Sequence, residues 1–287
     1  MTSRLRRSLG IVALTLGLTA GTALTAAAIT GGTADGTGHP NVGLIAFYDQ
    51  DGRFRCSATL VTPTVVLTAA HCTTGTLGKT LVTFRSVIAL EGPTSGLPLA
   101  ANPAAGYTQA ELETAGYLSG TAHTHPAYSN FTDLDNWNDV GVIVLDRPVT
   151  GITPAKVAPA NYLDAFAPPK LSKTLFTSVG YGTEVRKPVS GPQKPTPQSF
   201  PLIRRFAVEP GQKLSPQILQ VNGNINDTRG TGGTCFGDSG GPSFHGGFVV
   251  TVTSYGYTQN CRYLAGMQRV DIPVVQLWLA TFGVRFG

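Results

Sequence analysis

Ser239 lies in a glycine-rich segment with the features of a nucleophile turn. Residues 234–242 read Thr-Cys-Phe-Gly-Asp-Ser-Gly-Gly-Pro. A turn with so little side-chain bulk lets a substrate carbonyl approach the N–H groups of Gly237 and Ser239, and two such donors can stabilise an oxyanion. Because a serine hydroxyl is a weak nucleophile, it needs a base within hydrogen-bond reach and a third group that orients the base. The rest of the chain must therefore supply both.

Among five histidines, His71 has the setting of such a base. It ends an apolar, β-branched run over residues 65–70, which is typical of a buried strand. Asp139 precedes a second apolar run, residues 140–145, where a partly buried carboxylate would require a donor such as an imidazole N–H. Each residue alone has a structural explanation, as a core histidine, a strand cap or a turn serine. Their joint occurrence, in the order His71, Asp139, Ser239, favours catalysis.

This order distinguishes between two hydrolase folds. Gly237–Gly241 also satisfies the G-x-S-x-G pattern of α/β-hydrolases, whose triad runs serine, acid, histidine along the chain. After Ser239 the sequence contains one histidine, His245, and none follows Asp271. The α/β-hydrolase interpretation therefore fails.

The chain resembles the trypsin-like serine peptidases of the chymotrypsin fold over residues 29–287. Three motifs in the same order carry the resemblance, and three shorter ones support it. The main motifs are Leu67–Cys72, Asn138–Val142 and Gly237–Pro242, and the shorter ones are Ile29–Gly32, Gly180–Thr183 and Ser254–Gly256. The resemblance implies an all-β protein, with two antiparallel six-stranded β-barrels and the triad in the cleft between them. It places the first barrel at about 29–150, the second at about 151–271 and a C-terminal helix at about 273–283.

The resemblance also implies roles for individual residues. His71, Asp139 and Ser239 would be catalytic, and Gly237 and Ser239 would form the oxyanion hole. Four cysteines in an exported chain favour two disulfides, for which the sequence permits three pairings. The resemblance selects Cys56 with Cys72 and Cys235 with Cys261.

Composition agrees with a turn-rich β protein. The chain has 35 glycines, 20 prolines and only 13% charged residues. Residues Val274–Phe282 alone have convincing helical periodicity. Two segments, Glu91–Gly120 and Lys187–Pro201, are expected to be insertions.

Residues 1–28 are expected to be a signal peptide. Three arginines precede an apolar stretch that is too short to span a bilayer, and Ala26–Ala28 provide a cleavage site. We therefore expect a secreted, extracellular monomer without stable membrane association. Ile29 directly follows the site, and the family pattern would pair its new ammonium group with Asp238, which would couple export to activation.

Charge and motifs favour no other ligand class. The formal net charge of +5 falls to +2 once the signal segment with its three arginines is removed, so nucleic acid is not an expected partner. Arg186-Lys187 and Arg204-Arg205 are interpreted as parts of a solvated loop, and His123–His125 as a surface turn. The cysteine and histidine spacings match no zinc motif, and no metal or cofactor is expected.

A protein or peptide substrate is expected, without preference for basic side chains. The resemblance assigns Gly233 and Thr234 to the base of the primary pocket and Ser254, Tyr255 and Gly256 to its side. Because no acid lies between Gly230 and Cys235, cleavage after basic residues is not supported. Gly256 leaves the pocket mouth open to a large side chain and Tyr255 supplies an apolar wall, so cleavage after aromatic or large apolar residues is preferred. The segment Ala265–Gln268 departs from the family pattern, which leaves open a charge supplied by another part of the chain.

Two alternatives to a peptidase remain at this stage. One is a secreted binding or adhesin-like protein on the same fold, and the other is an esterase that uses the same triad. The complete set of His71, Asp139, Ser239 and the glycine turn favours an enzyme over a binding protein.

Overall fold

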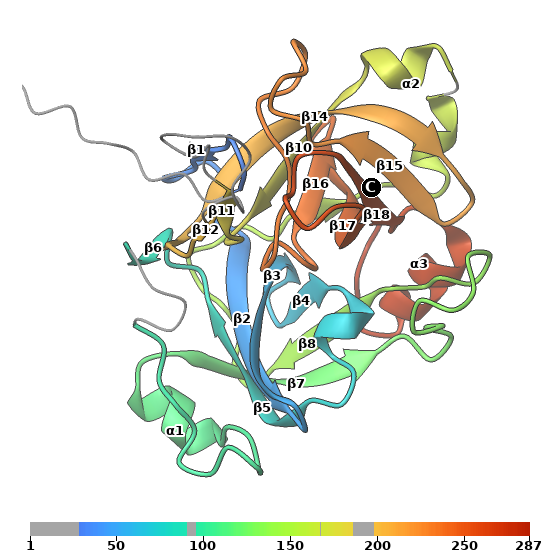
Figure 1. Cartoon of the computed structure of the whole chain (residues 1–287). Coiled ribbons are helices and arrows are strands. Elements are labelled where there is room, and N and C mark those ends of the chain that lie inside the picture. The colour runs from blue at the N-terminus through green and yellow to red at the C-terminus, as the bar shows by residue number, and fades with distance from the viewer. Residues whose placement is uncertain (1–28, 91–95, 167, 186–197) are drawn as a thin grey trace, which may run out of the picture.

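Two β-barrels stacked on one another form the molecule. The computed structural model describes residues 29–90, 96–166, 168–185 and 198–287, so the expected signal peptide and Arg186-Lys187 lie outside the described residues. The first barrel occupies the lower half of Figure 1 and the second the upper half. Among the described residues, no helix is long and apolar enough to cross a membrane.

The first barrel closes from six antiparallel strands in the order β2-β3-β4-β8-β7-β5. Its first hairpin turns at Asp49–Gly52, where the Asp49 carboxylate accepts the N–H of Asp51 at 2.7 Å and Gly52 adopts a φ of 142°. The strands are β2 (Val42–Asp49), β3 (Gly52–Thr62), β4 (Val65–Thr68), β5 (Leu77–Thr83), β7 (Leu118–Thr124) and β8 (Gly141–Leu145).

The second barrel also has six strands, because β14 and β15 pair and close the path β14-β10-β16-β17-β18-β15. Its strands are β10 (Leu175–Gly180), β14 (Arg205–Leu214), β15 (Ile218–Asn222), β16 (Pro242–His245), β17 (Phe248–Gly256) and β18 (Leu264–Arg269). Two short strands extend the sheet: β1 (Thr33–Ala34) pairs with β14 and β9 (Lys156–Val157) with β17. Residues 33–34 thus join the second barrel, although the sequence assigns them to the first.

The remaining elements connect or cover the barrels. Two small ribbons form from β6 (Val87–Ala89) with β13 (Leu202–Ile203) and from β11 (Glu184–Val185) with β12 (Gln198–Ser199). The 3-10 helices are η1 (Ala70–Cys72) and η2 (Tyr162–Ala165), and the α-helices are α1 (Gln109–Thr114), α2 (Lys170–Lys173) and α3 (Pro273–Ala280). The all-β, two-barrel prediction is confirmed.

The C-terminal helix α3 follows the predicted periodicity. Proline occupies its first turn, where a missing N–H costs nothing, and Val275 and Leu279 are buried four residues apart. Both belong to an apolar cluster that includes Val65 and Val142 of the first barrel and Val252 of the second. The helix therefore packs on a core that the two barrels share.

Helix α1 lies inside the segment 91–120 that was expected to be an insertion, of which 91–95 lie outside the described residues. The sequence prediction missed this helix. Its start is a capping box, in which the Thr108 hydroxyl accepts the N–H of Glu111 and the Glu111 carboxylate accepts the N–H of Thr108. The T-x-x-E spacing is the sequence signal that predicts such a start.

Arg204 and Arg205 are buried, so the prediction that this pair lies in a solvated loop is wrong. Arg204 is 2% exposed and donates to the Asp35 carboxylate at 2.7 Å. It also donates to the carbonyls of Gly36, Val42 and Phe84. Because an arginine presents five N–H donors in a planar fork, one side chain can join the N-terminal segment, β2 and the end of β5.

The Asp35 carboxyl is the acidic partner of this contact. Burial acts to raise its pKa, but hydrogen bonds from His39 and Arg204 lower the pKa of Asp35 to about 2. The Asp35 carboxyl is therefore ionised at neutral pH.

The His123–His125 segment is likewise no surface turn. His123 and Thr124 belong to β7, and His125 is 4% exposed and packs edge-on against Trp278 of α3, with ring centroids 5.0 Å apart. Burial lowers the pKa of His125, which favours a neutral imidazole in this contact.

Both disulfides implied by the resemblance are present. Cys56–Cys72 joins β3 to η1, and Cys235–Cys261 joins the segment before Ser239 to the loop between β17 and β18. In this way each disulfide immobilises a segment next to a predicted site residue.

Replacing Arg204 with methionine should lower the free energy of unfolding by about 3–5 kcal/mol, because it leaves the Asp35 charge buried without its main partner. Urea unfolding would measure this change. The exposed Arg147→Met variant is the control and should stay within about 0.5 kcal/mol of the parent. An Arg204→Met protein as stable as the parent would contradict the assigned role.

Candidate active site

His71 is delivered by strand β4. The strand is fully buried, and the chain then enters η1, where small alanines at positions 69 and 70 pack without exposed surface. The His71 N–H donates to the Asp139 carboxylate at 2.9 Å, and Nδ1 lies 2.8 Å from the second carboxylate oxygen. Two contacts to one carboxylate fix both the backbone and the ring.

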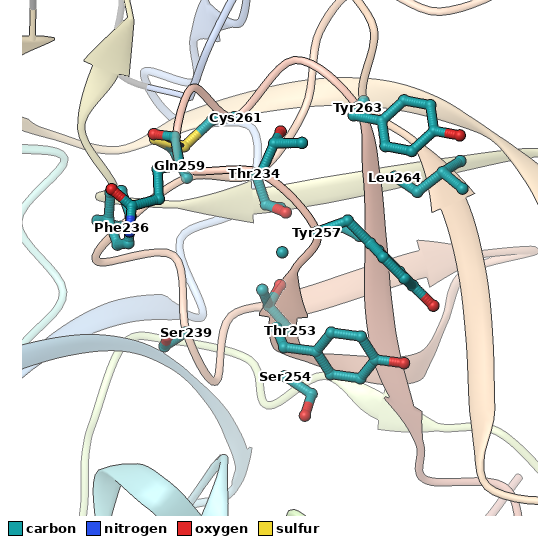
Figure 2. A pocket seen from close by; sticks show the side chains of 16 residues that line it. Thr234, Phe236, Ser239, Thr253, Ser254, Tyr257, Gln259, Cys261, Tyr263 and Leu264 are labelled. Carbon is teal, nitrogen blue, oxygen red and sulfur yellow. Dashed lines mark hydrogen bonds between the residues drawn. A yellow bond between two sulfur atoms is a disulfide. The ribbon is translucent and has the colours of Figure 1, made fainter. Parts of the chain in front are cut away.

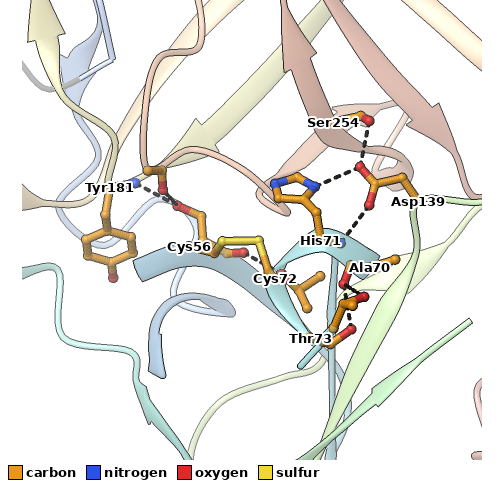
Figure 3. The surroundings of a disulfide bond; sticks show 12 residues. Cys56, Ala70, His71, Cys72, Thr73, Asp139, Tyr181 and Ser254 are labelled. Carbon is orange, nitrogen blue, oxygen red and sulfur yellow. Dashed lines mark hydrogen bonds and ion pairs between the residues drawn. A yellow bond between two sulfur atoms is a disulfide. The ribbon is translucent and has the colours of Figure 1, made fainter. Parts of the chain in front are cut away.

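Asp139 is fully buried and has four hydrogen-bond contacts. Its carboxylate binds His71 twice and also accepts the Ser254 hydroxyl at 2.6 Å, while its N–H donates to the Gln268 side chain at 3.0 Å. The preceding Asn138 has a φ of 43°, a left-handed conformation that asparagine tolerates well. Figure 3 shows that the His71 ring and the Ser254 hydroxyl both contact the same oxygen of the Asp139 carboxylate. Because an ionised carboxylate can only accept, the proton of the imidazole is held on Nδ1 and Nε2 is left as the basic nitrogen.

Aromatic side chains lie over this pair. The Phe131 ring lies 5.5 Å from the His71 ring and 5.2 Å from Trp137, centroid to centroid. Trp137 donates its indole N–H to the Ser254 hydroxyl at 2.9 Å. The sequence prediction assigned no role to either residue, although Trp137 stands two positions before Asp139.

Ser239 lies on a turn just before β16. The backbone conformation of this turn depends on two glycines. Gly237 and Gly240 have φ angles of 94° and 73°, which residues with a side chain rarely adopt. A Cβ on Gly240 would lie 2.0 Å from Thr68 Oγ1 and 2.7 Å from the Ala69 nitrogen. The nucleophile turn therefore packs directly on the segment that leads into His71.

Ser57 ties the same turn to the first barrel. Its N–H donates to the Ser239 carbonyl at 2.8 Å, and its hydroxyl donates to the Gly237 carbonyl at 2.9 Å. Within the described part of the chain, hydrogen bonds of the turn use the N–H groups of Asp238, Gly240 and Gly241, but not those of Gly237 and Ser239. The last two are thus available as the donor pair expected of an oxyanion hole.

Asp238 points away from this hole into the protein. Its carboxylate accepts the N–H groups of Gly182 and Cys235 at 2.7 and 2.8 Å, and a Cβ on Gly180 or Gly182 would lie within 2.2 Å of it. Burial raises the pKa of Asp238 to about 7, against the opposing effect of these donors and of the Arg55 charge. A carboxyl in this environment gains stability from an added cation.

The expected partner of Asp238, Ile29, is also buried but makes other contacts. Its carbonyl accepts the N–H of Gly32, and the next residue, Thr30, pairs with Gly233. In the continuous chain the Ile29 nitrogen is an amide, and no ion pair to Asp238 forms among the described residues. Ile29 and Asp238 therefore pair only if the chain is cut before Ile29.

A cavity of about 370 Å³ opens beside Ser239 (Figure 2). No lysine, arginine, aspartate or glutamate lines it, and aromatic rings from Phe236, Tyr255, Tyr257 and Tyr263 contribute to its wall. Apart from Leu264 and Ser239, the remaining lining residues are small or polar: Gly223, Thr234, Cys235, Thr253, Ser254, Gly256, Thr258, Gln259, Cys261 and Ala265. A large uncharged side chain would fit these surroundings.

The structure places four of the five predicted substrate-binding residues on this cavity, and Gly233 is the exception. Gly233 donates its N–H to Thr30 at 2.9 Å, and a Cβ on it would lie 2.4 Å from the Cα of Gly223. Because the N-terminal segment pairs with Gly233, Gly223 takes its place on the lining. Strand pairing also settles the position of β18, since Gly256 faces Ala265 and Tyr255 faces Gly266.

One buried acid behind the cavity was not predicted. Glu209 of β14 is fully buried, and its carboxylate accepts the Ser178 hydroxyl and, at 3.4 Å, the N–H of Thr234. Burial is the main cause that raises the pKa of Glu209 to about 7. The sequence gave no signal for its position, because the contacts join segments 25 or more residues apart.

The described residues offer one cluster with metal-ligand chemistry, Cys56, His71 and Cys72. Both sulfurs belong to the Cys56–Cys72 disulfide and cannot act as thiolate ligands. The imidazole is held by Asp139. This cluster therefore does not fit a metal ion.

Comparison with known proteins identifies the family. A family model described as Trypsin matches residues 29–278. The chain belongs to the trypsin family. No curated protein sequence matches this trypsin-family chain significantly.

Solved structures agree with the fold. HL collagenase is similar with a TM-score of 0.62 and 18% identity, over 90% of this chain and 100% of that one. Human heparin binding protein has a TM-score of 0.57 and 18% identity, over 90% and 99% of the two chains. The scabies mite inactivated protease paralogue S-D1 has a TM-score of 0.58 and 16% identity, over 90% and 100%. At these identities the similarity shows the fold alone.

Replacing Glu209 with glutamine should change how stability depends on pH. The ordinary pKa of 4.5 rises to about 7 in the fold, so between these values the folded chain holds a proton that the unfolded chain has lost. The parent protein therefore loses stability as pH rises through this window, and the Glu209→Gln variant lacks that loss. Between pH 5 and pH 8, urea unfolding should show the variant gaining about 2–3 kcal/mol relative to the parent. Equal pH dependence of the two proteins would contradict this.

Proposed function

We propose that the chain is a secreted serine endopeptidase in which Ser239 is the nucleophile, His71 the general base and Asp139 the orienting carboxylate. The observation that carries the proposal is the buried Asp139 carboxylate, which lies 2.8 Å from His71 Nδ1 and also accepts the Ser254 hydroxyl. This arrangement fixes the ring in the tautomer whose free nitrogen can accept a proton. A binding protein has no need for such an arrangement.

The reaction proceeds by acyl transfer. His71 Nε2 takes the Ser239 proton as Oγ attacks the peptide carbonyl, and Asp139 stabilises the imidazolium that forms. The N–H groups of Gly237 and Ser239 hold the oxyanion. His71 then protonates the leaving amine, and a water molecule activated by the same residue hydrolyses the acyl-enzyme. No cofactor takes part in these steps.

The cavity beside Ser239 is the proposed site for the side chain that precedes the cleaved bond. Tyr255 and Gly256 lie on the strand proposed to pair with the substrate backbone, and Thr234 lies at the cavity base. The lining carries no charge and several aromatic rings, which supports cleavage after aromatic or large apolar residues.

A binding function on the same fold is the second candidate. One similar structure is described as a heparin binding protein and another as an inactivated protease paralogue. This chain has His71, Asp139, Ser239 and the glycine turn, which supports catalysis. An esterase would use the same residues, and hydrolysis of peptides as well as esters by the same serine distinguishes the two enzymes.

We further propose that signal cleavage after Ala28 releases Ile29 and that its ammonium group pairs with Asp238. Asp238 is buried beside the oxyanion turn, and burial raises the pKa of Asp238 to about 7 despite the Arg55 charge, so an added cation would favour its charged form. The added cation would stabilise the turn in its catalytic conformation. The product is an extracellular monomer that acts on proteins or peptides.

The Ser239→Ala variant should hydrolyse a mixed peptide library about 10⁴- to 10⁶-fold more slowly than the parent, because it lacks the nucleophile but retains the fold. Mass spectrometry of the digest measures the rate. Ser172→Ala, a change on α2 far from the site, should leave the rate unaltered. Near-normal hydrolysis by Ser239→Ala would refute the assignment.

N-terminal sequencing of the exported protein should find Ile29 as the first residue. A chain that keeps residues before Ile29 should be about 10²-fold or more less active, because a buried carboxylate without its cation is strongly destabilised. If a protease recognition site is inserted directly before Ile29, cleavage of this chain by that protease should restore activity. A mature start at another residue, with full activity, would remove this part of the proposal.

A further inference from the structure

At one point the base of the cavity beside Ser239 is a thin wall, with a buried carboxylate on its far side. Gly223 and Thr234 both line the cavity, and Glu209 lies directly behind them. Glu209 Oε1 is 3.4 Å from the Thr234 nitrogen and would be 3.2 Å from a Cβ placed on Gly223. Because Gly223 has no side chain, a single layer of backbone separates the carboxylate from the cavity.

The Glu209 carboxylate has hydrogen-bond donors but no cation. Oε2 accepts the Ser178 hydroxyl, which lies 3.1 Å from the Ser243 hydroxyl. Within the described part of the chain, no lysine, arginine or histidine forms an ion pair with Glu209. A buried charge with neutral partners alone projects a stronger field than a charge that is paired or in water.

The geometry points to Glu209 as a specificity-determining residue of the cavity, whose ionised form selects substrates with arginine or lysine before the cleaved bond. When Glu209 is protonated, the cavity presents aromatic and neutral polar groups and selects large uncharged side chains. This inference rests on the proposed peptidase function and deepens it. In this interpretation the negative charge of the pocket comes from Glu209 behind Gly223 and Thr234, and not from a residue of the lining.

The ionisable groups around Glu209 determine the pH at which the preferred substrate side chain changes from uncharged to basic. Strands β10 and β15 contain no ionisable residue, and His245 of β16 lies 2.9 Å from the Tyr162 hydroxyl instead. On β14 itself, Arg205 is buried four residues away, and Asp238 lies on the nucleophile turn. Burial is the largest cause that raises the pKa of Glu209 to about 7; the Asp238 charge acts in the same direction, and the hydrogen bonds from Ser178 and Thr234 oppose it. The carboxyl is therefore neutral at pH 5.5 and ionised at pH 8.5.

The test compares peptides that differ only before the cleaved bond, with arginine, its neutral isostere citrulline, or phenylalanine. The ratio of kcat/KM for arginine over citrulline cancels any effect of pH on the catalytic steps that both substrates share. For the mature enzyme this ratio should rise about tenfold or more between pH 5.5 and pH 8.5. In Glu209→Gln it should be low and independent of pH, while phenylalanine is cleaved as by the parent. Glu113→Gln, an exposed change on α1, is the matched control and should keep the parent profile.

Each outcome decides the inference. A flat ratio in the parent enzyme overturns it, even if Glu209→Gln fails to fold, and so does a rising ratio that Glu209→Gln retains. Labelling of Ser239 by a fluorophosphonate verifies that the variant has a folded site. Absence of both labelling and hydrolysis in the mature parent would refute the proposed function itself, whereas labelling with a flat ratio refutes only the role of Glu209.

Discussion

Hydrogen bonds at Ser57 join the nucleophile turn of the second barrel to the first barrel, and the candidate site depends on this junction. His71 and Ser239 come from different barrels, and a displacement of about 1 Å between reacting groups is enough to reduce catalysis strongly. Ser57 binds the carbonyls of both Gly237 and Ser239, and its hydroxyl accepts the N–H of Tyr181. Its neighbour Cys56 is linked to Cys72, next to His71. The dipeptide Cys56-Ser57 thus positions both groups: Ser57 holds the nucleophile turn by hydrogen bonds, and the Cys56–Cys72 disulfide holds the segment that contains His71.

Buried carboxylates around this junction have distinct environments. Asp35 lies beside Arg204 and His39, and its pKa falls to about 2, so it acts as a permanent ion-pair partner. Asp139 has hydrogen-bond donors from both barrels, which orients the imidazole. Asp238 and Glu209 have neutral donors, and burial raises the pKa of each to about 7. Asp35 and Asp139 each hold a fixed set of hydrogen-bond partners, whereas Asp238 and Glu209 respond to pH or to an added cation.

The sequence predicted the two barrels and the helix α3 because local patterns determine them. Apolar β-branched runs mark β4 and β8, and three- and four-residue steps mark α3. The spacing of these elements, with the glycine turn, was enough to select His71, Asp139 and Ser239 as candidates. It also predicted that Thr234, Tyr255 and Gly256 would share a pocket, and the structure brings them together on one cavity.

Contacts between distant segments could not be predicted in this way. Strand β14 turns Arg205, Ala207 and Glu209 inward, so its interior face is largely polar and hydrophobic patterning gives no sign of burial. Arg204 binds Asp35, which lies 169 positions earlier in the chain. Gly233, which was predicted to line the cavity, pairs with Thr30 instead, and Gly223 lines the cavity in its place. These features depend on how the N-terminal segment packs on the second barrel, which no local pattern specifies.

The most direct test of the account is reaction of the mature protein with a fluorophosphonate, followed by peptide mapping. We predict one adduct, on Ser239, formed at a rate that falls about 10²-fold or more in His71→Ala because the base is missing. A folded mature protein that forms no adduct, or forms it on another serine, would contradict the claim that this turn carries an activated nucleophile.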